Sequence, residues 1–194
     1  VQKATPAGGK IDAYEDYIAW GMIEPKEGAF DFSHHERVYS LVTSAGLQWI
    51  PYLWCHVPPT WLRDDPRATL MRCNAHGQPC YMLSIFDPQT IEWYRHFYEA
   101  LHRQFGARIP ETYACILGPY GEGNYPLPYV DWVLRLGHCH EGYWCGDSHA
   151  LPAFRRAMER KYAAVAALNA AWDTSFTGFA DVRFPEEITS TSVT

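Results

Sequence analysis

The 194-residue chain has no run of about 18 consecutive apolar residues, which is the length that a membrane-spanning helix needs. Positive charge is also sparse, with 16 Lys and Arg against 22 Asp and Glu and a formal net charge of −6. Because nucleic-acid binding depends on clustered positive side chains, this balance argues against nucleic acid as the main partner. We therefore expect a globular domain with a sizeable core and with neither a nucleic acid nor a membrane as partner.

Two motifs that would fix a function are absent. No Gly-rich dinucleotide-binding loop follows the first predicted strand, which excludes the commonest function of an open, doubly wound sheet. No paired CxxC spacing is present, which argues against a strongly specified zinc site.

The six cysteines give information about the cellular location of the protein and do not indicate a fold held together by disulfides. The chain is larger than the small secreted domains that depend on disulfides, so we expect reduced thiols and a cytoplasmic location. No signal peptide is visible, but the chain begins with Val1 rather than Met. We therefore expect a trimmed or partial N-terminus, and the missing signal decides little about location.

Aromatic residues are in excess, with 8 Trp, 13 Tyr and 9 Phe. Many of them must fill the core. Trp and Tyr also combine a large apolar ring with a polar tip, which suits them to stack on sugar rings. For any single ring, the sequence alone does not decide between packing in the core and stacking on a sugar.

Strand patterns and helix patterns alternate along the chain. Strands are predicted at 13–20, at 47–54, which is a mostly apolar run, and at 112–117. The stretch 63–83 is polar and has no clear period. Strands that alternate with amphipathic helices predict a parallel sheet with right-handed crossovers, either open or closed into a (β/α)8 barrel.

Four helices are predicted. The first covers 33–45, where Ser33 and Glu36 have capping-box spacing. The second follows Asp87-Pro88, an N-cap with Pro at the first helical position. Two more follow Ser148, the second of them through 165–172. The second helix carries an apolar stripe that we expect to be buried, formed by Ile91, Tyr94, Tyr98, Leu101 and Phe105.

Both sheet architectures place function in the loops that follow the carboxyl ends of the strands. Glu122 lies in such a loop, flanked by glycines that allow tight turns and close approach of a ligand. In a partly dry cleft beside Tyr120 and Tyr125, its carboxyl would stay protonated near neutrality and could donate a proton to a leaving oxygen. The alternative is a surface Glu in a mobile loop.

The loop after the second predicted strand is stiffened by two successive prolines. We expect His56 to hydrogen-bond sugar hydroxyls and Trp54 or Trp61 to stack on a ring. The alternative is that both Trp side chains are core residues and that His56 bonds a neighbouring carbonyl.

Three acidic residues near the first predicted strand are expected to have structural roles. Glu15 and Asp16 lie inside the strand, where a charge needs a partner or a use, so we expect a salt bridge. The alternative is that one of them points into the mouth of the barrel. Glu24 follows in a turn, and we expect it to hold the loop rather than to catalyse.

Residue types suited to zinc gather at His138, Cys139, His140 and Cys145, with Cys73 and Cys80 elsewhere. The spacing does not form pairs, so we expect a polar loop with reduced thiols and no cofactor. A structural zinc at Cys139 and Cys145 is the alternative.

Several segments together resemble known enzymes. The sequences WGMIEP at 20–25 and EGAFDFS at 27–33 resemble the opening of barrel glycoside hydrolases of the β-galactosidase family 42 type. PPTWL at 58–62 and the segments 154–162 and 168–174 follow in the family's order. The similarity covers most of the chain.

The resemblance implies a partial (β/α)8 TIM barrel over 1–194, a single domain with roughly strands 2 to 4 and the helices that follow them. It implies that 112–117 is the fourth strand, that the first strand precedes Val1, and that Glu122 is the acid/base. The nucleophile of this clan follows the seventh strand, which the chain does not reach.

The implied function is a β-galactosidase-like glycoside hydrolase that cleaves O-glycosidic bonds in a glycoside or oligosaccharide. The remaining barrel segments or a second copy of the chain are its expected protein partners. The residues expected to bind substrate are Trp20, Trp54, His56, Trp61, Tyr120, Asn124 and Tyr125.

Departures from the family pattern leave the mechanism and the activity open. Gly121 stands where the clan usually has Asn, and the loop GPYGEGNYP at 118–126 is similar to that of β-amylase, an inverting enzyme. The stereochemical outcome therefore stays open. Competing hypotheses are a non-catalytic carbohydrate-binding half-barrel, a structural fragment that needs its missing segments, and a zinc-dependent hydrolase.

Overall fold

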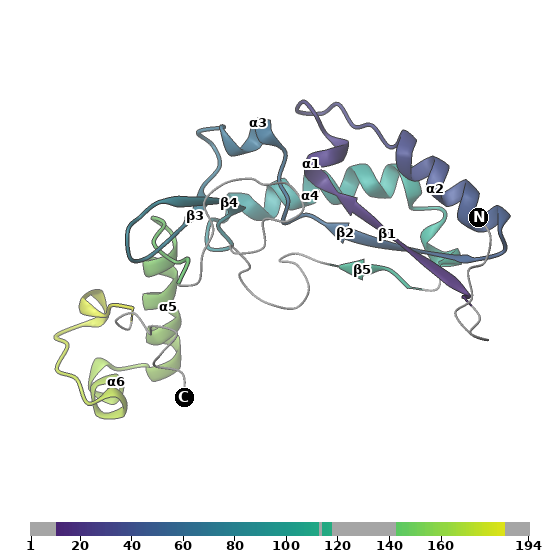
Figure 1. The fold of residues 1–194 in the computed structure, drawn as a ribbon. Coiled ribbons are helices and arrows are strands. Elements are labelled where there is room, and N and C mark those ends of the chain that lie inside the picture. The colour runs from purple at the N-terminus through teal and green to yellow at the C-terminus, as the bar shows by residue number, and fades with distance from the viewer. Residues whose placement is uncertain (1–10, 113, 118–142, 185–194) are drawn as a thin grey trace. The chain divides into compact units, whose positions relative to one another are not determined.

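The computed structural model describes residues 11–112, 114–117 and 143–184 (Figure 1). The chain divides into two compact units, the first formed by 1–68 and 91–127 and the second by 69–90 and 128–194. The single domain expected from the sequence stays a prediction.

The first unit contains a three-stranded sheet in the order β1-β2-β5 (Figure 1). Its strands are β1 (Ala13–Ala19), β2 (Gln48–Trp54) and β5 (Ile116–Leu117). Both strand pairs are parallel, which confirms the parallel sheet predicted from the alternating pattern. The first strand ends one residue earlier than predicted, because Trp20 opens the short helix α1 (Trp20–Ile23).

Side-chain alternation gives β1 and β2 two different faces. Asp16 and Ile18 are buried on the face that also carries Trp49. Helix α2 (Ser33–Ser44) packs against this face, where the rings of Tyr39 and Trp49 lie 5.3 Å apart. The opposite face carries the side chains with the other parity, among them Tyr17.

Helix α4 (Gln89–Phe105) fills the core of the first unit with aromatic rings. The ring centroids of Phe97 and Trp20 lie 5.6 Å apart, and those of Phe105 and Trp49 lie 5.3 Å apart. A helix in a protein is stabilised mainly by packing against the rest of the chain, and buried aromatic rings dominate such packing.

The predicted buried stripe of α4 was partly wrong. Leu101 and Phe105 are buried as expected, but Ile91 is 63% exposed. The buried positions instead include Trp93, Phe97 and Ala100. The rings of Trp93 and Phe97 carry no hydroxyl group and face the core, whereas Tyr94 and Tyr98 are half-buried.

The predicted capping box was also wrong. Phe32 is the N-cap of α2 and makes no side-chain cap bond. The carboxylate of Glu36 instead accepts hydrogen bonds from Gln104 and Arg108, and the bond from Arg108 lowers the pKa of Glu36. A charge-assisted bond to a distant Arg is stronger than a local cap, so the tertiary partner prevails.

An antiparallel hairpin lies within the stretch that has no sequence period. It pairs β3 (Leu70–Arg72) with β4 (Pro79–Leu83) in the second unit. Three residues are too few to show an alternating pattern, which is why this strand escaped prediction. The short helix α3 (Thr60–Arg63) precedes it in the first unit.

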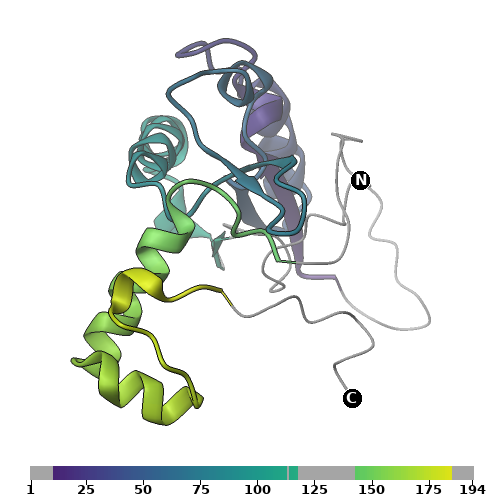
Figure 2. The same cartoon turned by 90° about the vertical axis from the view of Figure 1, so that its left-hand side faces the viewer.

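The second unit also contains the two helices predicted near the C-terminal end, α5 (Ala150–Tyr162) and α6 (Val165–Trp172). The chain then returns so that the 3-10 helix η2 (Phe179–Asp181) lies beside α5 (Figure 2). A similar turn, η1 (Ile109–Glu111), follows α4 in the first unit. None of the helices in the described parts of the chain combines the length and hydropathy needed to cross a membrane.

Candidate active site

An aromatic cluster lies on the face of the sheet opposite the one that α2 covers. The ring of Tyr17 lies 5.1 Å from Tyr52 and 4.9 Å from Trp54, and Trp54 lies 5.1 Å from His56. The register pairs Tyr17 with Tyr52 and Ala19 with Trp54, so Tyr17, Tyr52 and Trp54 share one face. The cluster stands at the carboxyl end of β2, where barrel enzymes bind their substrates.

Tyr17 is the exposed member of this cluster. Its side chain is 43% exposed, whereas Tyr52 and Trp54 are buried beneath it. The ring of Trp54 meets the ring of Tyr17 at 86°, an edge-to-face contact that holds it in place. The half-buried imidazole of His56 lies next to Trp54 in the same cluster, with its ring centroid 5.1 Å from that of Trp54.

Sequence reasoning did not select Tyr17. Side chains alternate along a strand, so the sequence does show that Tyr17 lies on the same face of its strand as Ala19, two residues later. Only the register showed that this face also carries Trp54.

The loop after β1 is held by the fully buried carboxylate of Glu24. This carboxylate accepts hydrogen bonds from Trp20 Nε1 at 2.5 Å, from the Gly28 amide at 2.6 Å and from His96 Nε2 at 2.6 Å. The Trp61 indole also donates to the Glu24 carbonyl at 3.1 Å. These bonds agree with the expectation that Glu24 holds the loop.

The loops after β1 and β2 also meet backbone to backbone. The Gly21 amide donates to the Val57 carbonyl at 2.8 Å. A Cβ at Gly21 would lie only 3.0 Å from the Pro58 carbonyl oxygen, so a larger residue would push the loops apart. The two loops that carry Trp20, His56 and Trp61 are therefore one connected structure.

The structure places the expected substrate-binding residues differently. Trp20 is fully buried and serves as a donor to Glu24, so it has no exposed ring face here. Trp54 is buried under Tyr17, and His56 and Trp61 are half-buried. The remaining candidates lie outside the described residues, namely Tyr120, Glu122, Asn124 and Tyr125.

Cys55 lies between Trp54 and His56 but is not a nucleophile near neutral pH. Burial raises the pKa of its thiol to about 11, and a hydrogen bond from Tyr98 opposes this shift only in part. A thiol that stays protonated is a weak nucleophile, because the thiolate is the reactive form.

The remaining residues considered from the sequence are Asp16 and the cysteine and histidine residues of the possible zinc site. Asp16 makes the salt bridge expected for the strand, with His35 Nδ1 at 3.1 Å. Cys55, Cys73, Cys115 and Cys145 are free thiols, and burial raises the pKa of Cys145. The rest of the proposed zinc cluster, His138, Cys139 and His140, lies outside the described residues.

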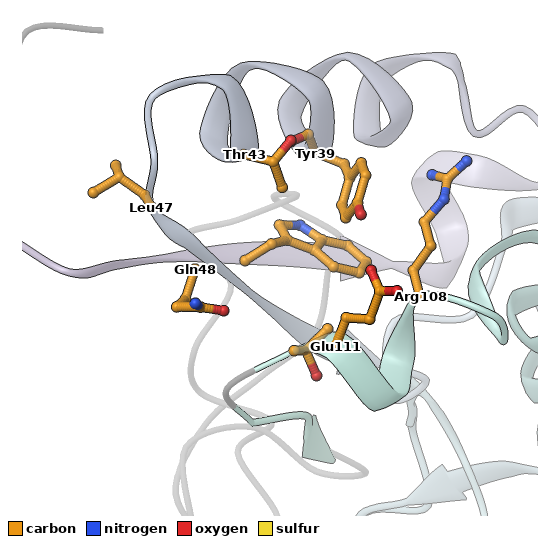
Figure 3. Close-up of a pocket in the computed structure, with 8 residues that line it drawn as sticks. Tyr39, Thr43, Leu47, Gln48, Arg108 and Glu111 are labelled. Carbon is orange, nitrogen blue, oxygen red and sulfur yellow. The ribbon is translucent and has the colours of Figure 1, made fainter.

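A separate pocket of about 80 Å³ lies at the opposite end of β2 (Figure 3). Tyr39 and Thr43 line it from α2, Gln48 lines it from the start of β2, and Arg108 and Glu111 come from the segment after α4. In barrel enzymes this end of the strands serves stability, whereas substrates bind at the other end. The aromatic cluster around Tyr17 is therefore the better candidate for the active site.

No protein-family model matches the chain. Among curated proteins, the thermophilic β-amylase of Thermoanaerobacterium thermosulfurigenes is 27% identical over 190 residues, which cover 88% of this chain and 34% of the β-amylase. A β-galactosidase of an Arthrobacter species is 30% identical over 160 residues, covering 82% of this chain and 21% of the β-galactosidase. The chain therefore spans about a third or less of the length of these relatives.

Solved structures agree with the sequence matches. The catalytic domain of β-amylase from Paenibacillus polymyxa superimposes with a TM-score of 0.69 and 25% identity, covering 90% of this chain and 46% of that domain. This similarity supports the expected TIM-barrel fold, while the numbering of the strands as 2 to 4 stays a prediction. The chain is therefore homologous to part of the TIM-barrel glycoside hydrolases that include β-amylases and β-galactosidases of the family 42 type.

Proposed function

We propose that the protein carrying this chain is a glycoside hydrolase that cleaves O-glycosidic bonds. The observation that carries the proposal is the aromatic cluster that Tyr17, Tyr52 and Trp54 form at the carboxyl end of the sheet. An aromatic cluster in that position suits the apolar face of a sugar ring. The relationship to β-amylases and β-galactosidases supports the same class of substrate.

In the proposed reaction, Glu122 protonates the glycosidic oxygen as the bond to the anomeric carbon breaks. A second carboxylate attacks the anomeric carbon or activates a water molecule. The two carboxyl groups would lie roughly 5 Å apart in a retaining enzyme and about 6.5–9.5 Å apart in an inverting one. Two carboxylates and water complete this chemistry, so the proposal includes no organic cofactor.

Substrate binding is assigned to the connected loops and to the loop of Glu122. His56 would hydrogen-bond sugar hydroxyls, and Trp61 would border the cleft from the loop that Glu24 holds. Trp54 would act from beneath, by fixing the ring of Tyr17. Tyr120, Asn124 and Tyr125 stay proposed contacts beside Glu122.

The proposed substrate is a β-galactoside, as the segments shared with family 42 enzymes suggest. The second candidate is amylose. It is favoured by the loop GPYGEGNYP at 118–126, which is similar to that of β-amylase, and by the Paenibacillus β-amylase domain among the solved structures. Assays on a β-galactoside and on amylose separate the two.

The proposal is tested by Glu122→Gln in the protein that carries this chain. We expect turnover of substrates with poor leaving groups to be lost, because those substrates depend most on a proton donor. Glu111→Gln is the matched control, since Glu111 is an exposed Glu beside the pocket at the other end of β2. Equal hydrolysis by Glu122→Gln and the parent protein would contradict the role of Glu122.

The same assay tests the non-catalytic alternative. A parent protein that binds an oligosaccharide, cleaves neither substrate and binds equally well after Glu122→Gln would be a carbohydrate-binding half-barrel.

A further inference from the structure

We propose that Asp16, His34 and His35 form a binding site for one divalent transition-metal ion, such as Zn²⁺, between β1 and α2. Each residue offers a ligand atom, and these atoms all lie within 4.8 Å of one another. Zinc binds His nitrogen and carboxylate oxygen at about 2.0–2.2 Å in tetrahedral geometry, so two ligands of one ion lie about 3.4 Å apart. Small side-chain adjustments would bring all three residues around one ion.

The fold brings these ligands together from two elements. Helix α2 covers one face of β1 (Figure 1). Asp16 lies on that face of β1, and His34 and His35 lie in the first turn of α2. The His35 imidazole already approaches both carboxylate oxygens of Asp16 at 3.1 Å. A metal ion could take the place of the proton that these two side chains share.

A neighbouring side chain orients the carboxylate. Trp49 Nε1 donates to Asp16 Oδ2 at 3.0 Å, and Trp49 itself is buried. Second-shell hydrogen bonds of this kind hold a ligand in its binding geometry and raise metal affinity. The donor is neutral, so it leaves the negative charge of Asp16 available to a cation.

Solvent reaches the site from one side. Asp16 and His35 are each about 5% exposed, whereas His34 is an exposed residue. The rings of His34 and His35 lie 5.0 Å apart at 86°, so they can approach an ion from two directions. Water molecules on the open side would complete the coordination shell, as in other sites with three protein ligands.

The ligand set also limits the kind of metal. Two imidazoles and one carboxylate suit Zn²⁺, Co²⁺, Ni²⁺ and Fe²⁺ better than Ca²⁺ or Mg²⁺, which prefer sites made of oxygen ligands. The partial positive charge at the N-terminus of α2 opposes a cation, but it is weak beside direct coordination by a carboxylate.

The site lies on the face opposite Tyr17, so its role would be to join β1 to α2 rather than to act on substrate.

The test is a titration of the chelator-treated protein with Co²⁺ and with Zn²⁺, followed by visible absorption and thermal unfolding. We expect one Co²⁺ to bind with the spectrum of nitrogen and oxygen ligands, without the charge-transfer band of a thiolate. An ion that binds only the folded state raises the unfolding temperature, so Zn²⁺ should stabilise the protein. A cobalt spectrum dominated by thiolate ligands would overturn the proposal, because it would place the ion on the cysteines.

Variants locate the site. His34→Ala removes an exposed ligand and should weaken binding by about tenfold or more. His102→Ala is the matched control, an exposed histidine on α4, and should bind like the parent protein. Asp16→Asn keeps the side-chain shape and should also weaken binding. Equal affinities for the parent protein and His34→Ala, or no binding by the parent protein, would overturn the proposal.

Discussion

Glu24 and His96, which are 72 residues apart in the sequence, are joined by a hydrogen bond of 2.6 Å from His96 Nε2 to the Glu24 carboxylate. This bond ties the loop after β1 to helix α4. The same carboxylate also holds the Trp20 indole and the Gly28 amide. Glu24 is therefore the point at which the loop, the core and the helix are fixed together.

Replacing Glu24 by Gln should destabilise the protein by about 3 kcal/mol, because three donors, of which the Trp20 indole is fully buried, lose a carboxylate acceptor and one of them meets an amide N–H instead. The free energy of unfolding in urea measures this change. Glu27→Gln is the control, since Glu27 lies in the same loop and pairs with Arg67 at an exposed position. Equal stability of the two variants would show that the bonds to Glu24 contribute little.

Two tyrosines of β1 offer a matched test of the candidate active site, which depends on the proposed function. Tyr17→Ala should weaken oligosaccharide binding by about tenfold, the effect expected from losing one aromatic contact of about 1.4 kcal/mol. Tyr14 is similarly exposed, at 48%, but lies on the other face of the strand, so Tyr14→Ala should leave the affinity unchanged. Calorimetric titration measures both values, and equal losses would remove the assignment to the Tyr17 face.

The buried thiol of Cys55 should make the stability depend on pH in alkaline solution. An unfolded thiol has a pKa of about 8.5, whereas burial raises the pKa of Cys55 to about 11 in the folded chain. The contribution of Cys55 is therefore complete below about pH 8.5 and is lost as the pH rises toward 11.

Cys55→Ala should accordingly lose less stability than the parent protein between pH 8.5 and 11. Thermal unfolding across this range is the measurement, and the titrating groups that do not contact Cys55 cancel in the comparison. Identical slopes for the two proteins would contradict the raised pKa.

Ala163 ends α5 with a φ of 59°, a conformation that favours glycine. Ala163→Gly should therefore stabilise the protein by about 1 kcal/mol, measured by urea unfolding. Ala164→Gly is the control, because Ala164 has an extended backbone and gains nothing from glycine there. Destabilisation by Ala163→Gly would mean that the backbone strain is not relieved.

Local sequence patterns predicted several of the regular elements of this protein. Residues 47–54 were recognised as a strand because their apolar character is continuous, and 165–172 were recognised as a helix because their apolar residues recur at helical spacing. The alternation of strands and helices likewise predicted that β1 and β2 are parallel, because such connections require crossovers. The placing of Glu122 as an acid/base came from family resemblance and awaits its test.

Only the tertiary structure decided which partner each side chain takes. The spacing of Ser33 and Glu36 predicts a local cap, yet Glu36 bonds Arg108, 72 residues away. The sequence cannot show that Tyr17 rests on Trp54, because the register of two strands depends on the packing of the whole sheet. Local patterns are set by the chain's own neighbours, whereas the candidate site is made by contacts that exist only once distant segments have packed together.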